Sequence, residues 1–295
     1  MTALTTPVSL EKAAQLAEIA ARVRARVLVA VHHAGGGHVG GPLSCADMLV
    51  AFYFHILSID PANPTWEARD RFILSKGHST IGLYAVMAER GYFPVEELLT
   101  FDAIDSRLQG HPDMTRLPGL DMSSGSLGQG ISPGIGMALG ARMRGMPFHT
   151  YVVIGDGESQ EGQIWEAAFV AARYGLDNLT VVLDYNGLQQ FGWQKPGERM
   201  LTPIENPAGK WQAFGWNTIE TDGHDIAQFI AAVERAKNHK GAPSIVTAHT
   251  IKGKGVSFIE DDYDWHARVP TDDELLTALE ELGQIELTPL SLMGG

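Results

Sequence analysis

The chain has 295 residues, of which 44% are hydrophobic and 19% charged, a balance typical of globular proteins rather than of disordered or fibrous chains. With 22 basic and 35 acidic residues, the formal net charge is −13, which disfavours nucleic acid and anionic membrane surfaces as partners. The single cysteine, Cys45, excludes an internal disulfide framework and a zinc site of several cysteines, and without a secretory signal or a membrane-length apolar run we expect a cytoplasmic protein.

Two helices are expected at the start of the chain, with a run of glycines between them. Apolar side chains recur at helical spacing over residues 9–34, where Ser9 can cap the first turn and Gly35-Gly36-Gly37 can end the last. Pro42 suits the first position of the next helix, which we expect to run to about residue 58.

After these helices, short apolar runs alternate with amphipathic segments. We expect strands at residues 71–74, 151–154, 179–183, 216–220 and 244–249. We expect helices at residues 79–90, 127–144, 163–174 and 226–238. Strands that alternate with helices form right-handed β-α-β units, so the predicted fold is α/β: a parallel sheet with helices on both faces and ligands at the carboxyl ends of its strands.

The end of the chain predicts one more helix. Thr271 and Glu274 have the spacing of a capping box, and leucines follow them. No repeat or obvious linker interrupts the pattern, so residues 1–295 are expected to form a single domain with a short C-terminal helical tail.

A glycine-acid turn follows the second predicted strand. Gly155-Asp156-Gly157 ends this strand, and glycines allow the backbone to turn sharply and to approach a ligand closely. A tight turn with a solvated aspartate is the simplest interpretation. A dinucleotide-binding fingerprint is disfavoured, because Gln160 stands where the third glycine would be required and because Asp156 would repel a bare pyrophosphate.

The Asp156 carboxylate is compatible with a diphosphate if a divalent cation lies between them. Mg²⁺ prefers octahedral oxygen ligands and is often shared between one or two protein oxygens and substrate phosphates. Asn186 follows the next predicted strand, thirty residues after Asp156, which leaves room for a helix and a strand. Because parallel strands end at the same edge of the sheet, we expect the two side chains to lie together.

The Gly-Asp-Gly turn followed by this asparagine resembles the thiamine-diphosphate motif, and residues 10–270 resemble the N-terminal half of transketolase. Seven segments carry the resemblance in order: GGGHVGG (35–41), LSKGHS (74–79), QGHPD (109–113), SSGSLGQG (123–130), GDGESQEGQ (155–163), DYNGLQ (184–189) and the stretch from IKGKG (251–255) to WH (265–266). Each segment alone is weak, but the series is specific. The resemblance implies a thiamine-diphosphate-binding domain that uses Mg²⁺, or Ca²⁺ or Mn²⁺ in its place, in the transfer of a two-carbon ketol unit.

The resemblance also assigns the metal and diphosphate contacts. Asp156 and Asn186 would be side-chain ligands of the cation, and the Leu188 carbonyl would be the third protein oxygen. Gly155 and Gly157 would let the diphosphate lie close to backbone N–H groups, near the N-terminus of the following helix.

Four of the 11 histidines match the family. By resemblance, His38, His111 and His266 would contact substrate hydroxyls and the reacting carbonyl oxygen, with His266 also at the cofactor. His78 would lie beside the diphosphate or the substrate, with Lys76 near the phosphates. Histidine suits this chemistry because it titrates near neutral pH and can both give and accept protons. Metal binding by these histidines is disfavoured, because no metal-ligand spacing joins them.

The remaining assignments concern a loop and a subunit interface. The SSGSLGQG segment resembles a loop that contacts the cofactor, through Gly125, Ser126 and Leu127. Glu161 and Glu166 match acidic positions that in the family face the subunit interface and link paired active sites, and Glu161 is also assigned to the cofactor site.

Two positions depart from the family's pattern. Tyr185 stands where many thiamine-diphosphate enzymes carry a second asparagine, a position at which transketolases vary. His249 stands where some family members have lysine, which puts a cofactor contact there in doubt.

A complete transketolase is about twice this length, and its second domain supplies the glutamate that protonates the aminopyrimidine ring of the cofactor. The chain therefore resembles the diphosphate-binding subunit of a split transketolase. We expect it to act on sugar phosphates with a partner subunit that carries the pyrimidine-binding domain, in a heterotetramer of two copies of each chain. The alternatives are a ketol transfer on an unusual sugar phosphate or sulfosugar, a reaction like 1-deoxyxylulose-phosphate synthesis, or a non-catalytic subunit. A nicotinamide dehydrogenase is disfavoured, because the dinucleotide-binding glycine pattern is incomplete at Gln160.

Overall fold

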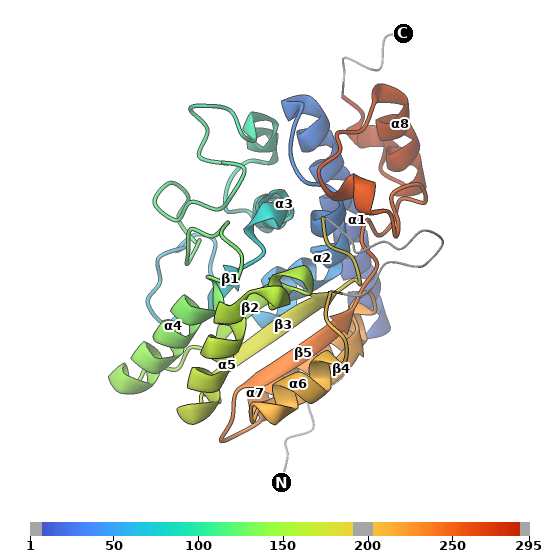
Figure 1. The fold of residues 1–295 in the computed structure, drawn as a ribbon. Coiled ribbons are helices and arrows are strands. Elements are labelled where there is room, and N and C mark those ends of the chain that lie inside the picture. The colour runs from blue at the N-terminus through green and yellow to red at the C-terminus, as the bar shows by residue number, and fades with distance from the viewer. Residues whose placement is uncertain (1–7, 191–202, 290–295) are drawn as a thin grey trace.

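The computed structural model describes residues 8–190 and 203–289 and contains a five-stranded sheet in which every pairing is parallel, with strand order β1-β2-β3-β5-β4 (Figure 1). The strands are β1 Arg71–Leu74, β2 Thr150–Gly155, β3 Leu179–Tyr185, β4 Asn217–Asp222 and β5 Ser244–His249. The α-helices are α1 Leu10–Ala34, α2 Gly40–Ala51, α3 Thr80–Arg90, α4 Ile131–Arg144, α5 Gly162–Arg173, α6 Pro207–Ala213, α7 Ile226–Asn238 and α8 Asp272–Glu281.

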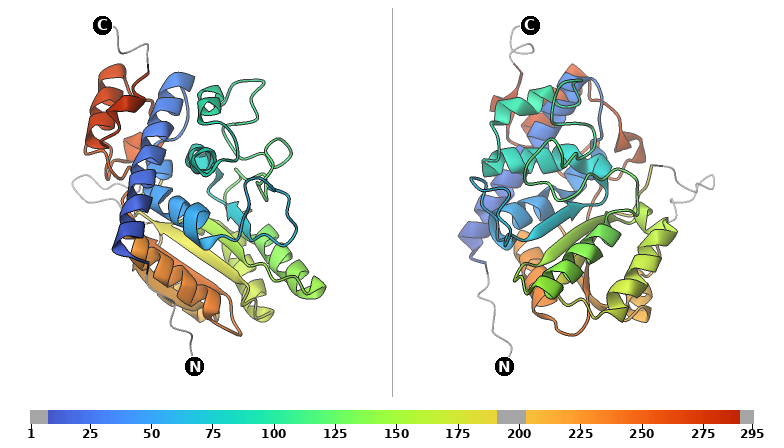
Figure 2. Two further views of the ribbon diagram at one scale, coloured as in Figure 1. Left: turned by 180° about the vertical axis from the view of Figure 1, so that it is seen from behind. Right: turned by 90° about the vertical axis from the view of Figure 1, so that its left-hand side faces the viewer.

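Helices cover both faces of this sheet, as the α/β prediction requires. Alternate residues of β2 point to opposite sides: Tyr151 and Val153 pack with α1, α2 and α7, whereas Val152 and Ile154 pack with α4, α5 and α6. Figure 2 shows the first group of helices from behind the sheet. The predicted fold class is therefore confirmed.

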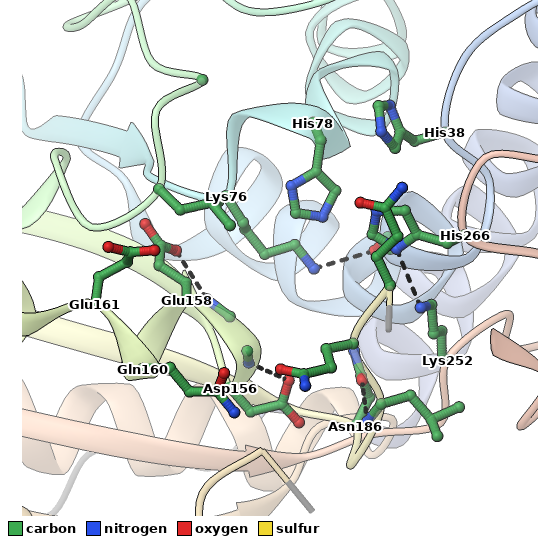
Figure 3. Close-up of a pocket in the computed structure, with 18 residues that line it drawn as sticks. His38, Lys76, His78, Asp156, Glu158, Gln160, Glu161, Asn186, Lys252 and His266 are labelled. Carbon is green, nitrogen blue, oxygen red and sulfur yellow. Dashed lines mark hydrogen bonds between the residues drawn. The ribbon is translucent and has the colours of Figure 1, made fainter. Parts of the chain in front are cut away.

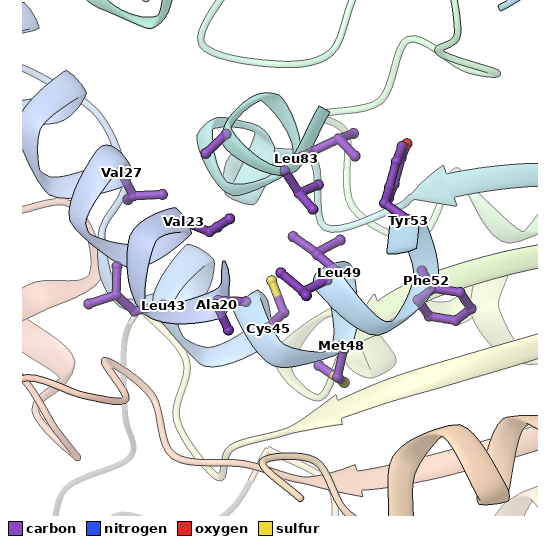
Figure 4. Close-up of a cluster of buried hydrophobic side chains, with 14 of the residues drawn as sticks. Ala20, Val23, Val27, Leu43, Cys45, Met48, Leu49, Phe52, Tyr53 and Leu83 are labelled. Carbon is purple, nitrogen blue, oxygen red and sulfur yellow. The ribbon is translucent and has the colours of Figure 1, made fainter. Parts of the chain in front are cut away.

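The larger core lies between the sheet and the helices α1, α2 and α3 (Figure 4). Every residue of α2 is buried, because this helix packs against α1, α3 and α7. The core therefore fixes the position of the glycine-rich turn, residues 35–41, from which α2 begins. Among the described residues, no helix is both long and apolar enough to cross a bilayer.

Most expected elements are confirmed, including all five strands, the Ser9 cap of α1 and the capping box of α8. The start predicted at Pro42 was wrong by two residues, since α2 begins at Gly40, and the same segment ends in a π-helical turn, Phe52–Ile56. The short helix α6, capped by Asn206, was not predicted.

The predicted start of the helix 127–144 was also wrong, since α4 begins only at Ile131. The preceding residues form an irregular loop, in which Gly125 and Gly128 have φ values of 153° and 80°. Such values favour glycine and are incompatible with helix.

Candidate functional site

A pocket of about 420 Å³ lies at the carboxyl ends of four strands (Figure 3). Lys76 and His78 follow β1, Asp156 follows β2, Asn186 follows β3 and Lys252 follows β5, and all five residues line the pocket. Residues that are distant in sequence meet here because parallel strands end at the same edge.

The bottom of the pocket is formed by Asp156, Asn186 and Leu188, which we call the floor. Asp156 is 2% exposed and accepts hydrogen bonds from the N–H groups of Gly157 (2.7 Å) and Gly187 (2.6 Å). Burial, and next the negative charge of Asp184, raises the pKa of Asp156 to about 7. A cation at the floor would offset the cost of ionising this buried carboxyl group.

Asn186 is oriented by its neighbours. Its Nδ2 donates to Ser44 Oγ (3.2 Å), and its Oδ1 accepts from the Leu188 N–H (3.1 Å). A carbonyl oxygen has two lone pairs, so Oδ1 can also bind a cation. The floor thus offers a carboxylate, an amide oxygen and the Leu188 carbonyl, which is a donor set suited to a hard cation such as Mg²⁺.

In the pocket wall next to the floor, a buried ion pair joins the lining residue Lys76 to Asp184. Asp184 also accepts hydrogen bonds from Ser44 Oγ (2.8 Å) and Thr250 Oγ1 (2.5 Å). Burial acts to lower the pKa of Lys76, but the attraction of Asp184 outweighs it and raises the pKa above its ordinary value. Lys76 is therefore charged and contributes positive potential to the pocket that it lines.

Four histidines face one another above the floor, and we call His38, His78, His111 and His266 the histidine wall. The ring centroids of His38, His78 and His266 lie 5.1–5.2 Å apart, and the His111 centroid lies 6.3 Å from that of His38. His111 lines a neighbouring hollow of about 610 Å³ that shares His38 with the pocket. The four histidines that the sequence selected are thus brought together.

Three rings of the histidine wall are neutral at physiological pH. Burial is the largest cause in each case: it lowers the pKa of His38, together with the nearby His111 and Lys252, and lowers that of His78 well below its ordinary value, together with Lys76. The pKa of His266 falls to about 3, through burial and then the charge of Lys252. A neutral imidazole carries one N–H donor and one lone pair, so these rings can both give and accept protons.

Lys252 and Glu158 were not selected from the sequence. Lys252 Nζ lies 3.1 Å from His266 Nδ1, and burial, followed by the charge of Lys76, lowers its pKa to about 8. The sequence signal that could have identified Lys252 was its position three residues after the end of a predicted strand. Glu158 accepts from the N–H groups of Gly128 (2.8 Å) and Gly155 (3.0 Å), and so joins the loop before α4 to the glycine-acid turn.

The other expected cofactor contacts divide into two groups. Gly125, Leu127, Gly155, Gly157 and the exposed Glu161 all line the pocket, whereas Ser126 is exposed and lies outside its lining. A side chain on Gly125 would place its Cβ 3.0 Å from the His111 ring, so glycine permits a close approach there.

Three further residues lie away from the pocket lining. Glu166 is exposed on α5. The Tyr185 hydroxyl donates to the Ile204 carbonyl (3.1 Å), and His249 pairs with Glu220 (2.8 Å) on the surface. The doubt about a cofactor contact at His249 agrees with this position.

Comparison with known proteins relates this geometry to a family. Residues 16–289 match the model of the transketolase thiamine diphosphate-binding domain. The 6-deoxy-6-sulfo-D-fructose transketolase subunit of a Clostridium species is 45% identical over 260 residues, which are 88% of this chain and 93% of that protein. An apulose-4-phosphate transketolase subunit from Actinobacillus succinogenes is 40% identical over 270 residues, which are 91% of this chain and 96% of that protein.

Solved transketolases have the same fold. That of Leishmania mexicana superposes with a TM-score of 0.83 at 28% identity, and that of Pichia stipitis in complex with sedoheptulose-7-phosphate with 0.84 at 30% identity. The matches cover 91% and 94% of this chain but only 41% and 42% of those chains, so this chain spans about two fifths of the solved transketolases. The resemblance found in the motifs is confirmed, and the chain belongs to the transketolase family through its thiamine diphosphate-binding domain.

Proposed function

We propose that this chain is the thiamine-diphosphate- and Mg²⁺-binding subunit of a two-chain transketolase, which transfers a two-carbon ketol unit from a ketose phosphate to an aldose or aldose phosphate. The observation that carries the proposal is the floor of oxygen donors directly below three neutral rings of the histidine wall, those of His38, His78 and His266. Thiamine diphosphate, when bound, supplies the carbanion chemistry that cleaves the bond next to a ketose carbonyl.

The floor would hold the cation and, through it, the diphosphate. Asp156, Asn186 and the Leu188 carbonyl would provide three oxygens to Mg²⁺, with Ca²⁺ or Mn²⁺ as substitutes, and diphosphate oxygens would fill further positions. Gly157 suits a close approach, because a Cβ at this position would lie only 3.0 Å from Gln189 Cβ, which is closer than an ordinary contact. The Lys252 ammonium would add positive charge beside the diphosphate.

The histidine wall would manage protons on the sugar. An ammonium group only donates hydrogen bonds, so the contact between Lys252 Nζ and His266 Nδ1 leaves the proton of that neutral ring on Nε2. This N–H is available to an oxygen on which negative charge develops. His38 and His78, held neutral by burial, can exchange protons with neighbouring hydroxyls.

We further propose that residues 1–295 act as one domain in the cytoplasm, with a partner subunit that carries the pyrimidine-binding domain, in an assembly of two plus two. The relatives named as subunits, which this chain matches over nearly their full length, support a separate partner. On α5, Phe169 and Val170 are 64% and 39% exposed, Tyr174 directly after the helix is 56% exposed, and Glu166 lies on the same helix. An apolar surface of this kind supports a subunit contact along α5.

A sulfosugar or an unusual sugar phosphate is the second candidate donor. The relative that is 45% identical is named for 6-deoxy-6-sulfo-D-fructose, and another is named for apulose-4-phosphate. The two candidates share the same chemistry at the carbonyl and differ in the anionic end of the donor.

Reconstitution tests both the need for a partner subunit and the identity of the donor. The purified chain is mixed with its partner subunit, thiamine diphosphate and Mg²⁺, and ketol transfer to ribose-5-phosphate is followed with xylulose-5-phosphate or 6-deoxy-6-sulfo-D-fructose as donor. We expect activity only when both chains are present, and the donor with the higher kcat/KM identifies the substrate class. Full activity from this chain alone would refute the two-chain proposal.

A further inference from the structure

His224 lies outside the pocket, between β4 and α7, and its two ring nitrogens have different partners. Nε2 lies 2.8 Å from the backbone nitrogen of Ile251, and Nδ1 lies 2.8 Å from Asp47 Oδ2. A backbone N–H can only donate, so Nε2 carries the lone pair and the ring proton is on Nδ1. These contacts therefore select one neutral tautomer of His224.

Asp47 anchors this ring in the protein core. It is 6% exposed on α2 and pairs with Arg24 of α1, whose Nη1 lies 3.2 Å from Asp47 Oδ1. Burial acts to raise the pKa of Asp47, but Arg24 and the hydrogen bond from His224 outweigh it and hold the pKa below its ordinary value. The carboxylate is thus a permanent acceptor, and the ring is tied to the packed pair of helices.

Ile251 begins the turn that carries Lys252 to His266. The lysine stem passes Gly40, where a Cβ would lie 2.9 Å from Lys252 Cε, and the Gly253 N–H donates to the Gly40 carbonyl (3.0 Å). The stem is therefore closely confined, and the position of the backbone at Ile251 determines where the ammonium ends.

We propose that His224 is a positioning residue, which holds the backbone of Ile251 so that the Lys252 ammonium meets the histidine wall. The contacts connect the packed helices α1 and α2 to the pocket through a single imidazole ring. The kinetic consequence rests on the proposed function, whereas the contacts themselves lie within this chain.

Two substitutions separate the two contacts of the ring. In His224→Gln the amide oxygen can occupy the place of Nε2 and accept from Ile251, at the expense of the bond to Asp47. In His224→Asn the amide nitrogen can occupy the place of Nδ1 and reach Asp47, but Ile251 loses its acceptor. His249→Gln is the matched control, because His249 is an exposed histidine that pairs with Glu220 on the surface.

Nitrogen–proton correlation spectra of the histidine rings in the full chain test the proposal without any turnover. We expect His224 to be the Nδ1–H tautomer, and we expect the His266 ring signals to shift in His224→Asn but to stay in place in His224→Gln and His249→Gln. The opposite tautomer, or unchanged His266 signals in His224→Asn, would overturn the proposal. The tautomer is read in the unsubstituted chain, so this part of the test survives a variant that does not fold.

Kinetics of the complex with the partner subunit supply the second measurement. We expect kcat of His224→Asn to fall about tenfold through misplacement of Lys252, with most activity retained in His224→Gln and similar thermal midpoints for both. If both variants lost kcat equally and their midpoint temperatures of thermal unfolding fell equally, His224 would have a structural role only, and the positioning role would be refuted. If the unsubstituted complex transfers no ketol unit, the proposed function fails, while the ring spectra still decide the role of His224.

Discussion

The floor and the histidine wall of the pocket are built in different ways. The floor follows the ends of two paired strands, so backbone hydrogen bonds of the sheet fix its position directly. The wall comes from four separate segments, of which only the turn of His78 follows a strand, and its rings are held by packing and by single contacts such as that between Lys252 and His266. From this difference we infer that the floor retains the cofactor, whereas the wall supports turnover.

The largest effect is expected at the floor. Asp156→Ala removes the charged side chain that we propose as a ligand of the cation, so we expect thiamine diphosphate binding in the presence of Mg²⁺ to weaken beyond about a thousandfold. Isothermal titration calorimetry on the chain measures this affinity, with the exposed Asp105→Ala as control. Unchanged affinity in Asp156→Ala would show that the floor does not hold the cation.

A substitution in the wall should give the opposite result. His111 lies in the hollow next to the pocket, with its ring 6.3 Å from that of His38, so His111→Ala should spare cofactor binding and lower kcat about a hundredfold. Calorimetry and steady-state kinetics on the same preparation separate the two effects, and the exposed His33→Ala serves as control. If His111→Ala lowered both the affinity for thiamine diphosphate and kcat, His111 would belong to the cofactor site, and the proposed difference between floor and wall would be refuted.

The two regions also differ in how far the sequence predicts them. Asp156 and Asn186 follow apolar runs of strand length, and the rule that parallel strands end at one edge is sufficient to bring them together. The wall was assigned only by resemblance to a family, because nothing in the local sequence places loops from four parts of the chain in contact.

The same reason explains what was missed. The contact between Asp47 and His224 spans 177 residues, and no periodicity reports it. The loop before α4 contains apolar and small residues that suit a helix, but positive φ angles at Gly125 and Gly128 delay the helix to Ile131. Burial of Lys252 likewise depends on tertiary packing against Gly40 and not on its local sequence.

A pH profile tests the comparison at Lys252, which contacts His266 in the wall and interacts through its charge with Asp156 in the floor. Its pKa, lowered by burial to about 8, means that the charged form is present below this pH and is lost as the pH rises through it. Above about pH 8, Lys252 becomes a neutral amine that can also accept a hydrogen bond, so it no longer fixes the His266 proton on Nε2, and we expect kcat to fall about tenfold per pH unit. In Lys252→Met this alkaline decline should disappear from a lower and flatter profile, and an unchanged decline would assign it to another group.

The smallest effect is expected behind the floor, at Ser44. Its hydroxyl lies 3.2 Å from Asn186 Nδ2 and so helps to turn the amide oxygen toward the proposed cation site. Ser44→Ala should weaken Mg²⁺ affinity about tenfold, a typical cost of losing an outer contact to a metal ligand, while kcat at saturating Mg²⁺ stays within about twofold. Titration of activity with Mg²⁺ measures both quantities, with the exposed Ser58→Ala as control. A fall in kcat that added Mg²⁺ does not restore would show that the buried network acts on the histidine wall as well, because Ser44 also donates to Asp184, the partner of Lys76.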